Sequence, residues 1–193
     1  MRLTLKMRPK VLIGMCAPLV LLIGLGGLSM YSTANILRTA KWVDHTHEAL
    51  AEASAIVASA VDMETGMRGY LLAGKEVFLD PYKNGEKAAF GKINTLKKTV
   101  SDNPKQVARL EEAETALREW QSKVAEPTIG LRSEIGKAKT MDDIADLIGE
   151  ARGKQYFDKF RGIMGDFNAE EKTLMDQRQA ESAGIVRLTE QLI

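Results

Sequence analysis

The sequence predicts an all-α protein whose N-terminal transmembrane helix continues into an antiparallel up-down-up-down four-helix bundle. Residues 11–30 form a run of twenty residues without a charge. After that run, apolar side chains recur at spacings of three and four, the period of a helix that buries one face. The chain has few runs of β-branched residues, and no stretch is typical of a strand. Together these observations favour helices throughout.

Composition excludes several classes of protein. The chain has 193 residues, 45% hydrophobic and 6% aromatic, which suits one domain plus an anchor. Its formal net charge is +1 and its acidic and basic residues are intermixed, so it lacks the basic face that a nucleic-acid-binding protein needs. Cys16 is the sole cysteine and lies in the uncharged run, so no disulfide can form within the chain.

The N-terminal segment predicts an orientation in the membrane. Residues 1–10 carry four basic residues and no acid, and the first acidic residue of the chain is Asp44. Residues 11–30 would span the ~30 Å hydrocarbon core of a bilayer at ~1.5 Å per residue. Because basic flanks stay in the cytoplasm, we expect a single pass through the bacterial inner membrane, with the bulk of the chain in the periplasm or outside the cell.

A cleaved signal peptide is the alternative. Ser32-Thr33-Ala34 has the small-x-small pattern that a signal peptidase accepts. The uncharged run is longer than the usual ~7–15 apolar residues of a signal peptide, and the helical pattern continues past Ala34. We therefore favour a retained anchor.

The bundle is expected over residues 35–190, and its first two helices have clear ends. The first helix covers about 35–73, continuous with the membrane span, and Gly74 ends it. The second covers about 81–100 and begins with Asp80 as its cap and Pro81 as its first residue.

The other two helices are marked by proline and by a capping pattern. The third covers about 104–138, and Pro127 should break or bend it because proline lacks a helical N–H donor. The fourth covers about 141–193, and Thr140 and Asp143 have the spacing of a capping box at its start.

Charges and glycines interrupt the apolar pattern near the end of the first helix. Glu64 and Arg68 are four residues apart and fall on the predicted core-facing stripe. Gly66 and Gly69 each cost the helix about 1 kcal/mol relative to alanine, which is most easily explained if another backbone approaches there. The predicted stripe consists of Leu50, Val57, Val61, Leu71 and Leu72.

This stretch resembles a known family. Its order of residues is similar to the signature of the type-three CHASE domain, the extracellular helical sensor module of bacterial chemoreceptors, histidine kinases and cyclases. A weaker similarity to the family's closing helix extends the resemblance to about residues 45–180, with Met67 and Ala73 as mild departures. The first motif is Glu64-Thr65-Gly66, Arg68-Gly69-Tyr70-Leu71-Leu72, Gly74, Phe78-Leu79 and Pro81-Tyr82, and the second is Arg161, Phe167, Glu171, Leu174 and Arg178.

The charged residues of these motifs have two interpretations. They could form a signalling or ligand site, or an internal ion pair that fixes helix register, and we favour the ion pair. If the first helix leaves the membrane near residue 30, Glu64 lies ~50 Å above it, at the height of Arg161 on a returning last helix. We therefore predict that Glu64 pairs with Arg161, whereas Glu171 and Arg178 lie nearer the membrane. If the pair is buried, removing either partner should cost several kcal/mol.

No metal, cofactor or catalytic site is predicted. His45 and His47 stand near Asp44 and Glu48, but side chains two apart on a helix point away from each other, so a solvated face is the simpler interpretation. The chain has no HExxH motif and no phosphate-binding GxxxxGK loop. We therefore do not expect an enzyme.

The aromatic residues indicate packing rather than a cofactor site. Trp120, Phe157, Phe160 and Phe167 lie at core spacing. Tyr70 and Tyr82 flank the turn after the first helix, and this tip is the first place where we would look for a ligand, whose identity the sequence leaves unknown.

The resemblance implies a membrane-anchored sensor module that relays a stimulus, a small molecule or a protein, by helix displacement. We expect a homodimer that acts on cytoplasmic partners through an output region missing from this chain. A methyl-accepting chemoreceptor is favoured as the parent, because that family pairs such bundles with a short basic N-terminus. A histidine kinase is the first alternative, and an anchored helical interaction protein without a small-molecule ligand is the second.

Overall fold

The structure is a computed structural model that describes residues 7–137, 139–149 and 152–192. Within these residues the chain is almost wholly helical, and it forms no strand apart from an isolated bridge between Ile135 and Lys139. The all-α prediction is therefore confirmed. Part of the predicted basic flank (residues 1–6) and the predicted last residue of the fourth helix, Ile193, lie outside the described residues.

The chain divides into two compact units, His45–Thr173 and the two terminal segments Met1–Asp44 and Leu174–Ile193. Within the terminal unit the Arg178 guanidinium carbon lies 4.1 Å from the centroid of the Trp42 ring. Among the described residues, one helix is long and apolar enough to cross a membrane, and its apolar window has a mean hydropathy of 1.7. This is α1 (Met7–Ala73), which runs without interruption from the apolar segment into the other unit.

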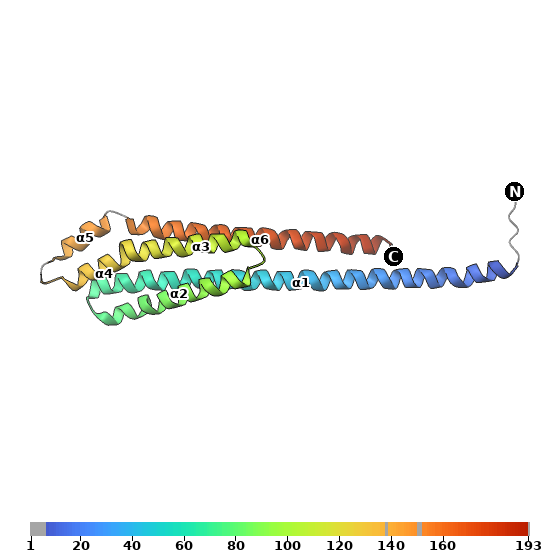
Figure 1. Cartoon of the computed structure of the whole chain (residues 1–193), viewed down its shortest axis with the longest axis horizontal. Helices are drawn as coiled ribbons and strands as arrows, with labels where there is room; N and C mark the ends of the chain where they lie inside the picture. The colour runs from blue at the N-terminus through green and yellow to red at the C-terminus, as the bar shows by residue number, and fades with distance from the viewer. Residues whose placement is uncertain (1–6, 138, 150–151, 193) are drawn as a thin grey trace. The chain divides into compact units, whose positions relative to one another are not determined.

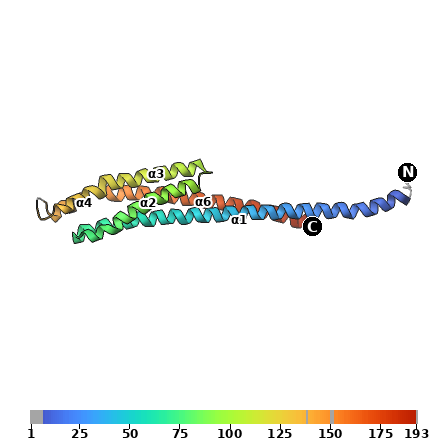
Figure 2. The same cartoon turned by 60° about the horizontal axis from the view of Figure 1, so that its bottom comes forward.

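The unit His45–Thr173 is a bundle in which successive long helices run antiparallel (Figures 1 and 2). Its helices are α1, α2 (Asp80–Thr99), α3 (Pro104–Trp120) and α6 (Arg152–Leu192). Contacts join the four helices into a ring. Helix α1 meets α2 near Gly85, and Lys97 of α2 pairs with Glu114 of α3 at 2.7 Å. Gln106 of α3 donates to the Phe167 carbonyl of α6 at 3.1 Å, and Arg161 of α6 lies 3.7 Å from Glu64 of α1.

The core-facing stripe of α1 differs from the predicted one. Leu72 is 80% exposed, and Leu50, Val57 and Val61 are only partly buried. The reason is that small residues form much of this seam, so that neighbouring helices come close to α1, and the larger apolar residues flank it. The buried apolar positions of α1 are Ala49, Ala53, Ile56, Ala60, Met63, Met67, Tyr70 and Leu71.

The turn after α1 confirms one predicted boundary and corrects another. Gly74 has φ +65° and its N–H donates to the Tyr70 carbonyl at 2.8 Å, so it ends the helix as predicted. Asp80 is the first residue of α2 rather than its cap, and Pro81 is the second. A 3₁₀ turn, η1 (Glu76–Leu79), already supplies an acceptor for the Asp80 N–H at the Val77 carbonyl, so no side-chain cap is needed there.

The third predicted helix continues through Pro127 rather than breaking. A π-helical segment, η2 (Gln121–Ala125), joins α3 to α4 (Glu126–Ser133). In the wider π turn the Glu126 N–H donates to the Gln121 carbonyl, five residues earlier rather than the usual four. The helix then continues into Pro127 at the second position of α4, where proline is tolerated. Helix α4 ends at Ser133 rather than at 138, and residue 138 lies outside the described residues.

The predicted fourth helix is two helices. Helix α5 (Met141–Gly149) begins where predicted, because the Thr140 N–H donates to the Asp143 carboxylate at 2.7 Å. The buried side chain of Ile144 lies on α5, which packs against α4 instead of continuing the seam of α6. The chain therefore leaves the bundle axis before α6 begins at Arg152.

Candidate functional site

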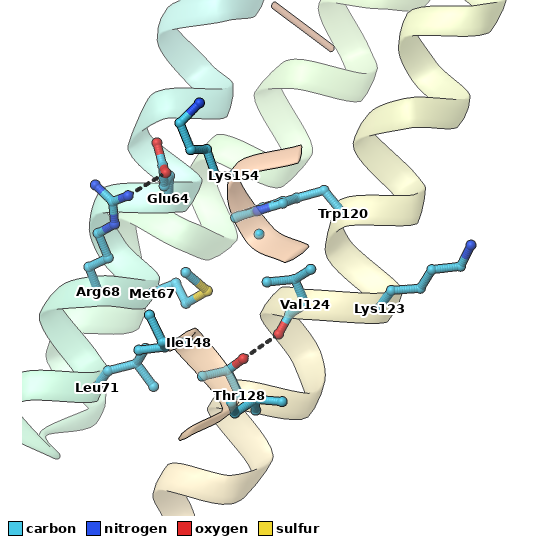
Figure 3. A pocket seen from close by; sticks show the side chains of 12 residues that line it. Glu64, Met67, Arg68, Leu71, Trp120, Lys123, Val124, Thr128, Ile148 and Lys154 are labelled. Atoms are coloured by element: carbon cyan, nitrogen blue, oxygen red, sulfur yellow. Dashed lines mark hydrogen bonds and ion pairs between the residues drawn. The ribbon is translucent and has the colours of Figure 1, made fainter. Parts of the chain in front are cut away.

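A cavity of about 270 Å³ lies inside the unit His45–Thr173 (Figure 3). Six elements contribute residues to its lining: α1, α3, η2, α4, α5 and α6. Its apolar lining is Met67, Leu71, Trp120, Val124, Leu147 and Ile148, and the rest is Glu64, Arg68, Lys123, Thr128, Gly153 and Lys154.

The apolar wall is built around Trp120, the last residue of α3. Its side chain is 1% exposed, and its ring packs edge-on against Phe157 with centroids 5.3 Å apart. Met67 and Leu71 of α1 are buried on the opposite side (Figure 3). A molecule in the cavity would therefore meet rigid apolar surface on two sides.

The π-helical segment brings further side chains to the cavity. Lys123 and Val124 come from η2, and the Thr128 hydroxyl of α4 donates to the Val124 carbonyl (Figure 3). Gly153 allows α6 to come close, because a Cβ there would lie 3.1 Å from the Val124 side chain. Short π segments occur often at functional sites.

The charged side of the cavity is centred on Glu64. Its carboxylate accepts a hydrogen bond from the Arg68 guanidinium at 2.7 Å and lies 3.7 Å from that of Arg161. The predicted pairing of Glu64 with Arg161 is thus present. The Arg161 guanidinium also lies 4.7 Å from the centroid of the Phe157 ring, so Arg161 contacts both the carboxylate and the aromatic cluster behind Trp120.

Arg68 does not face the core, contrary to expectation. The side chain of Glu64 is 15% exposed, whereas those of Arg68 and Arg161 are 67% and 48% exposed. On a helix of 3.6 residues per turn, each step of four residues rotates the side chain by about 40°, which carries Arg68 out of the buried stripe. The ion pairs therefore lie at the mouth of the cavity and in contact with solvent.

Two lysines complete the charged residues of the cavity. Lys154 pairs with Asp158 one turn along α6, near Glu64 in Figure 3. Lys123 lies 3.5 Å from the Glu119 carboxylate and 5.3 Å from the centroid of the Tyr156 ring, and its ammonium points away from the cavity (Figure 3). The neighbouring Tyr156 side chain, and then Glu119, raise the pKa of Lys123, which stays charged at neutral pH.

The remaining predicted charges lie elsewhere. Glu171 is buried and accepts a hydrogen bond from the Gln106 side chain at 2.8 Å. Arg178 belongs to the terminal unit, where it covers Trp42. Among the described residues, the structure thus brings Glu64, Arg68 and Arg161 together and leaves Glu171 and Arg178 with other partners.

The predicted glycines lie where chain segments meet. A Cβ on Gly66 would lie 2.5 Å from the Tyr82 backbone nitrogen, and one on Gly69 would lie 3.0 Å from the Phe78 ring. Gly85 on α2 makes an equally close contact, since a Cβ there would lie 2.5 Å from the Ser59 carbonyl oxygen. Sequence reasoning missed Gly85, although a glycine in the middle of an amphipathic helix was an available signal.

The predicted tip and the histidines have structural roles. Tyr70 and Tyr82 are buried in the core and do not line the cavity. His45 donates from Nε2 to the Thr99 carbonyl at 2.9 Å and is partly buried, so it does not lie on a fully solvated face, whereas His47 is exposed. Across the part of the chain that the structure describes, no three His, Cys, Asp or Glu side chains gather as a metal site would require.

Several site residues had no signal in the linear sequence. Lys123, Thr128 and Lys154 come from three separate elements, and nothing in their spacing shows that they meet. Arg132 was also missed: its Nε donates to the Leu71 carbonyl at 2.8 Å and so caps the end of α1 from another helix. The apolar repeat Ile144, Leu147 and Ile148 in α5 was the one available hint.

Comparison with known proteins agrees with this architecture. The structure is similar to the crystal structure of the Rhodopseudomonas palustris histidine kinase HK9 sensor domain, with a TM-score of 0.59 and 24% sequence identity. The superposed region covers 68% of this chain and 98% of the HK9 sensor domain. No curated protein matches the chain. The family model of the CHASE3 domain matches residues 39–181, close to the range that the motifs predict. The chain therefore belongs to the CHASE3 domain family.

Proposed function

We propose that this CHASE3 domain is the membrane-anchored extracytoplasmic sensor module of a bacterial signal-transduction receptor, of the methyl-accepting chemotaxis type. It would relay a stimulus across the inner membrane by displacement of α1 and α6. Support comes from the family match and from the candidate membrane span in α1. The proposal assigns sensing, not catalysis, to the bundle, and it includes a homodimer and cytoplasmic signalling partners.

One observation carries the proposal: α1 supplies a wall of the cavity and is a single helix from Met7 to Ala73. Four lining residues, Glu64, Met67, Arg68 and Leu71, lie on this helix. A molecule that repacks the cavity therefore acts directly on the helix that contains the candidate span. Packed helices respond to such a change by small shifts between discrete arrangements.

A histidine kinase is the second candidate for the parent receptor. The similar solved structure is the sensor domain of a histidine kinase, and the bundle would serve either output equally well. A third candidate, an anchored interaction protein, is favoured by the exposed apolar side chains of Ile36 and Leu37, which would equally suit a homodimer contact.

A hybrid receptor tests the proposal. Residues 1–193 would be joined to the second membrane span and output region of a well-characterised chemoreceptor, and in parallel to those of a histidine kinase. We expect Ile148→Trp, which enlarges a side chain that lines the cavity, to change the basal output, and Leu72→Trp, an equally large change outside the cavity, to leave it unchanged. Outputs that respond equally to both substitutions, or to neither, would contradict a sensing role for the bundle.

A further inference from the structure

We propose that the cavity binds a small molecule with an apolar body and a single carboxylate group, which docks against Arg68 and Lys154. This inference rests on the proposed sensor function and names the class of its stimulus. It depends on the size of the cavity, on its division into an apolar and a charged side, and on the sign of the charges there.

The size limits the ligand to a small one. The cavity has a volume of about 270 Å³. This is just below the ~300 Å³ at which pockets for larger ligands begin.

The division into two sides makes the ligand amphiphilic. Trp120, Met67 and Leu71 are buried and offer no charged group, so a polar atom against them would lose its hydrogen bonds to water. Glu64 and Arg68 are joined by a hydrogen bond at one edge of the cavity, with Lys154 next to Glu64 in the view of Figure 3. A ligand that satisfies both sides has one charged end and an apolar remainder.

The charges at that side favour an anion. Arg68 and Lys154 line the cavity and Arg161 lies 3.7 Å from Glu64, so three cations stand against two acids: Glu64, and Asp158, which pairs with Lys154. A cationic ligand would have to displace two guanidinium groups from Glu64. A carboxylate can share these cations with their acids, because Arg68 has five N–H donors and gives one hydrogen bond to Glu64.

Binding of an anion to Arg68 would change the partners of Glu64. The Glu64–Arg68 hydrogen bond joins residues of the same helix, whereas the Glu64–Arg161 contact joins α1 to α6 and, at 3.7 Å, is longer than a hydrogen bond. When the ligand shares Arg68, Glu64 is drawn towards Arg161, and the contact between the two helices tightens. The ligand thereby acts on the pair of helices that the sensor function requires to move.

Three matched probes test the inference: phenylacetate, 2-phenylethanol and 2-phenylethylamine, which share an apolar body and differ in their charged end. The full chain would be placed in lipid nanodiscs as the Trp42→Phe variant, so that the fluorescence of Trp120 alone reports binding. We expect phenylacetate to bind at least tenfold more tightly than the other two. Equal affinities for the three probes, or no saturable binding of any, would overturn the proposal.

Charge-removing variants locate the site. Arg68→Gln and, independently, Lys154→Gln should each weaken phenylacetate binding about five- to tenfold, with the helical circular dichroism unchanged. Arg118→Gln is the matched control, because Arg118 forms the same i,i+4 pair with a glutamate at 2.7 Å but does not line the cavity. A similar loss in all three variants would overturn the proposal.

The ligand class and the sensor function can fail separately. If phenylacetate does not bind but the hybrid receptor still responds to Ile148→Trp, the carboxylate ligand is wrong and the sensor function stands. If phenylacetate binds and the hybrid receptor is unresponsive, the site is correct and the sensor function is wrong.

Discussion

Gly66 determines how closely the turn after α1 can pack against that helix. The atoms that a Cβ on Gly66 would approach most closely belong to backbone, the Tyr82 nitrogen at 2.5 Å and the Phe78 carbonyl oxygen at 3.1 Å. Unlike the end of a flexible side chain, these atoms can move only if the 3₁₀ turn and the start of α2 move with them. The lack of a Cβ at Gly66 therefore allows the segment from η1 to the start of α2 to pack directly against α1.

We expect Gly66→Ala to destabilise the bundle by about 1–2 kcal/mol. Overpacking costs about 1–3 kcal/mol, and the better helix propensity of alanine returns up to about 1 kcal/mol. Gly91→Ala is the control, because a Cβ there meets nothing within 4 Å and should stabilise the protein slightly. Thermal and urea unfolding followed by circular dichroism measures both, and equal stabilities of the two variants would show that the close contact is absent.

The ion pair between Glu64 and Arg161 should contribute little to stability. The sequence predicted several kcal/mol for a buried pair, but both arginines around Glu64 are about half exposed or more, and such pairs contribute about 0–1 kcal/mol. A double-mutant cycle with Glu64→Gln and Arg161→Gln should give a coupling energy below about 1 kcal/mol. A coupling of several kcal/mol would show that solvent does not reach this pair.

The start of α5 shows how one carboxylate defines an element. The Asp143 carboxylate accepts from the Thr140 N–H at 2.7 Å and from its hydroxyl at 3.1 Å. These hydrogen bonds, the backbone one first, lower the pKa of Asp143. Because the folded pKa lies below the unfolded value of about 3.9, the stabilisation is complete above that pH and is lost as the pH falls through the folded pKa.

We therefore expect α5 to loosen in acid. Amide hydrogen exchange at Thr140 and along Met141–Gly149, expressed as protection relative to the unfolded chain, should fall progressively below about pH 4. Asp143→Asn should show reduced protection already at pH 7, whereas Asp142→Asn, which removes the neighbouring acid, should not. Protection that stays constant in Asp143→Asn would mean that packing against α4, rather than the cap, fixes this end.

Helix ends were predictable where they depend on a few adjacent residues. Gly74, Pro104 and the Thr140–Asp143 pair each act within one turn, and each is found where predicted. The π-helical segment was not predictable from adjacent residues. Whether the helix continues through Pro127 depends on which carbonyl accepts the hydrogen bond from the Glu126 N–H and on how the neighbouring helices pack against it. Similarly, the alanine-rich seam of α1 is defined by how closely other helices approach, which a count of large apolar residues does not show.

In the molecule as a whole, the all-α class and the family followed from the sequence, and the cavity did not. Glu64 and Arg68 could be named because both lie within one short motif on one helix. The cavity also depends on Trp120, Thr128 and Lys154, which come together only because α5 packs against α4 and α6 then returns alongside α1. Trp120 was predicted to be packing, and its ring has both roles, since it contacts Phe157 and lines the cavity.

The apolar part of α1 makes a prediction about the intact cell. The side chains of Leu19, Val20, Leu21, Leu22 and Ile23 are all exposed in the structure. Consecutive residues point in every direction around a helix, so this segment is apolar on all sides and requires an apolar solvent rather than a single buried face. Cys16 lies within it and is also exposed, which makes it a reporter of where the segment resides.

We expect Cys16 in spheroplasts to resist a membrane-impermeant maleimide and to react only after denaturation in detergent. In a Cys16→Ser background, Glu112→Cys in the bundle should react from outside, and Lys6→Cys should react only after lysis, because the basic flank stays in the cytoplasm. Mass spectrometry of the purified chain should show that residues before Asn35 are retained. Labelling of Glu112→Cys only after lysis would contradict the predicted orientation. A purified chain that begins after Ala34 would show that the apolar segment is a cleaved signal peptide. In that case α1 could not carry a displacement through the bilayer.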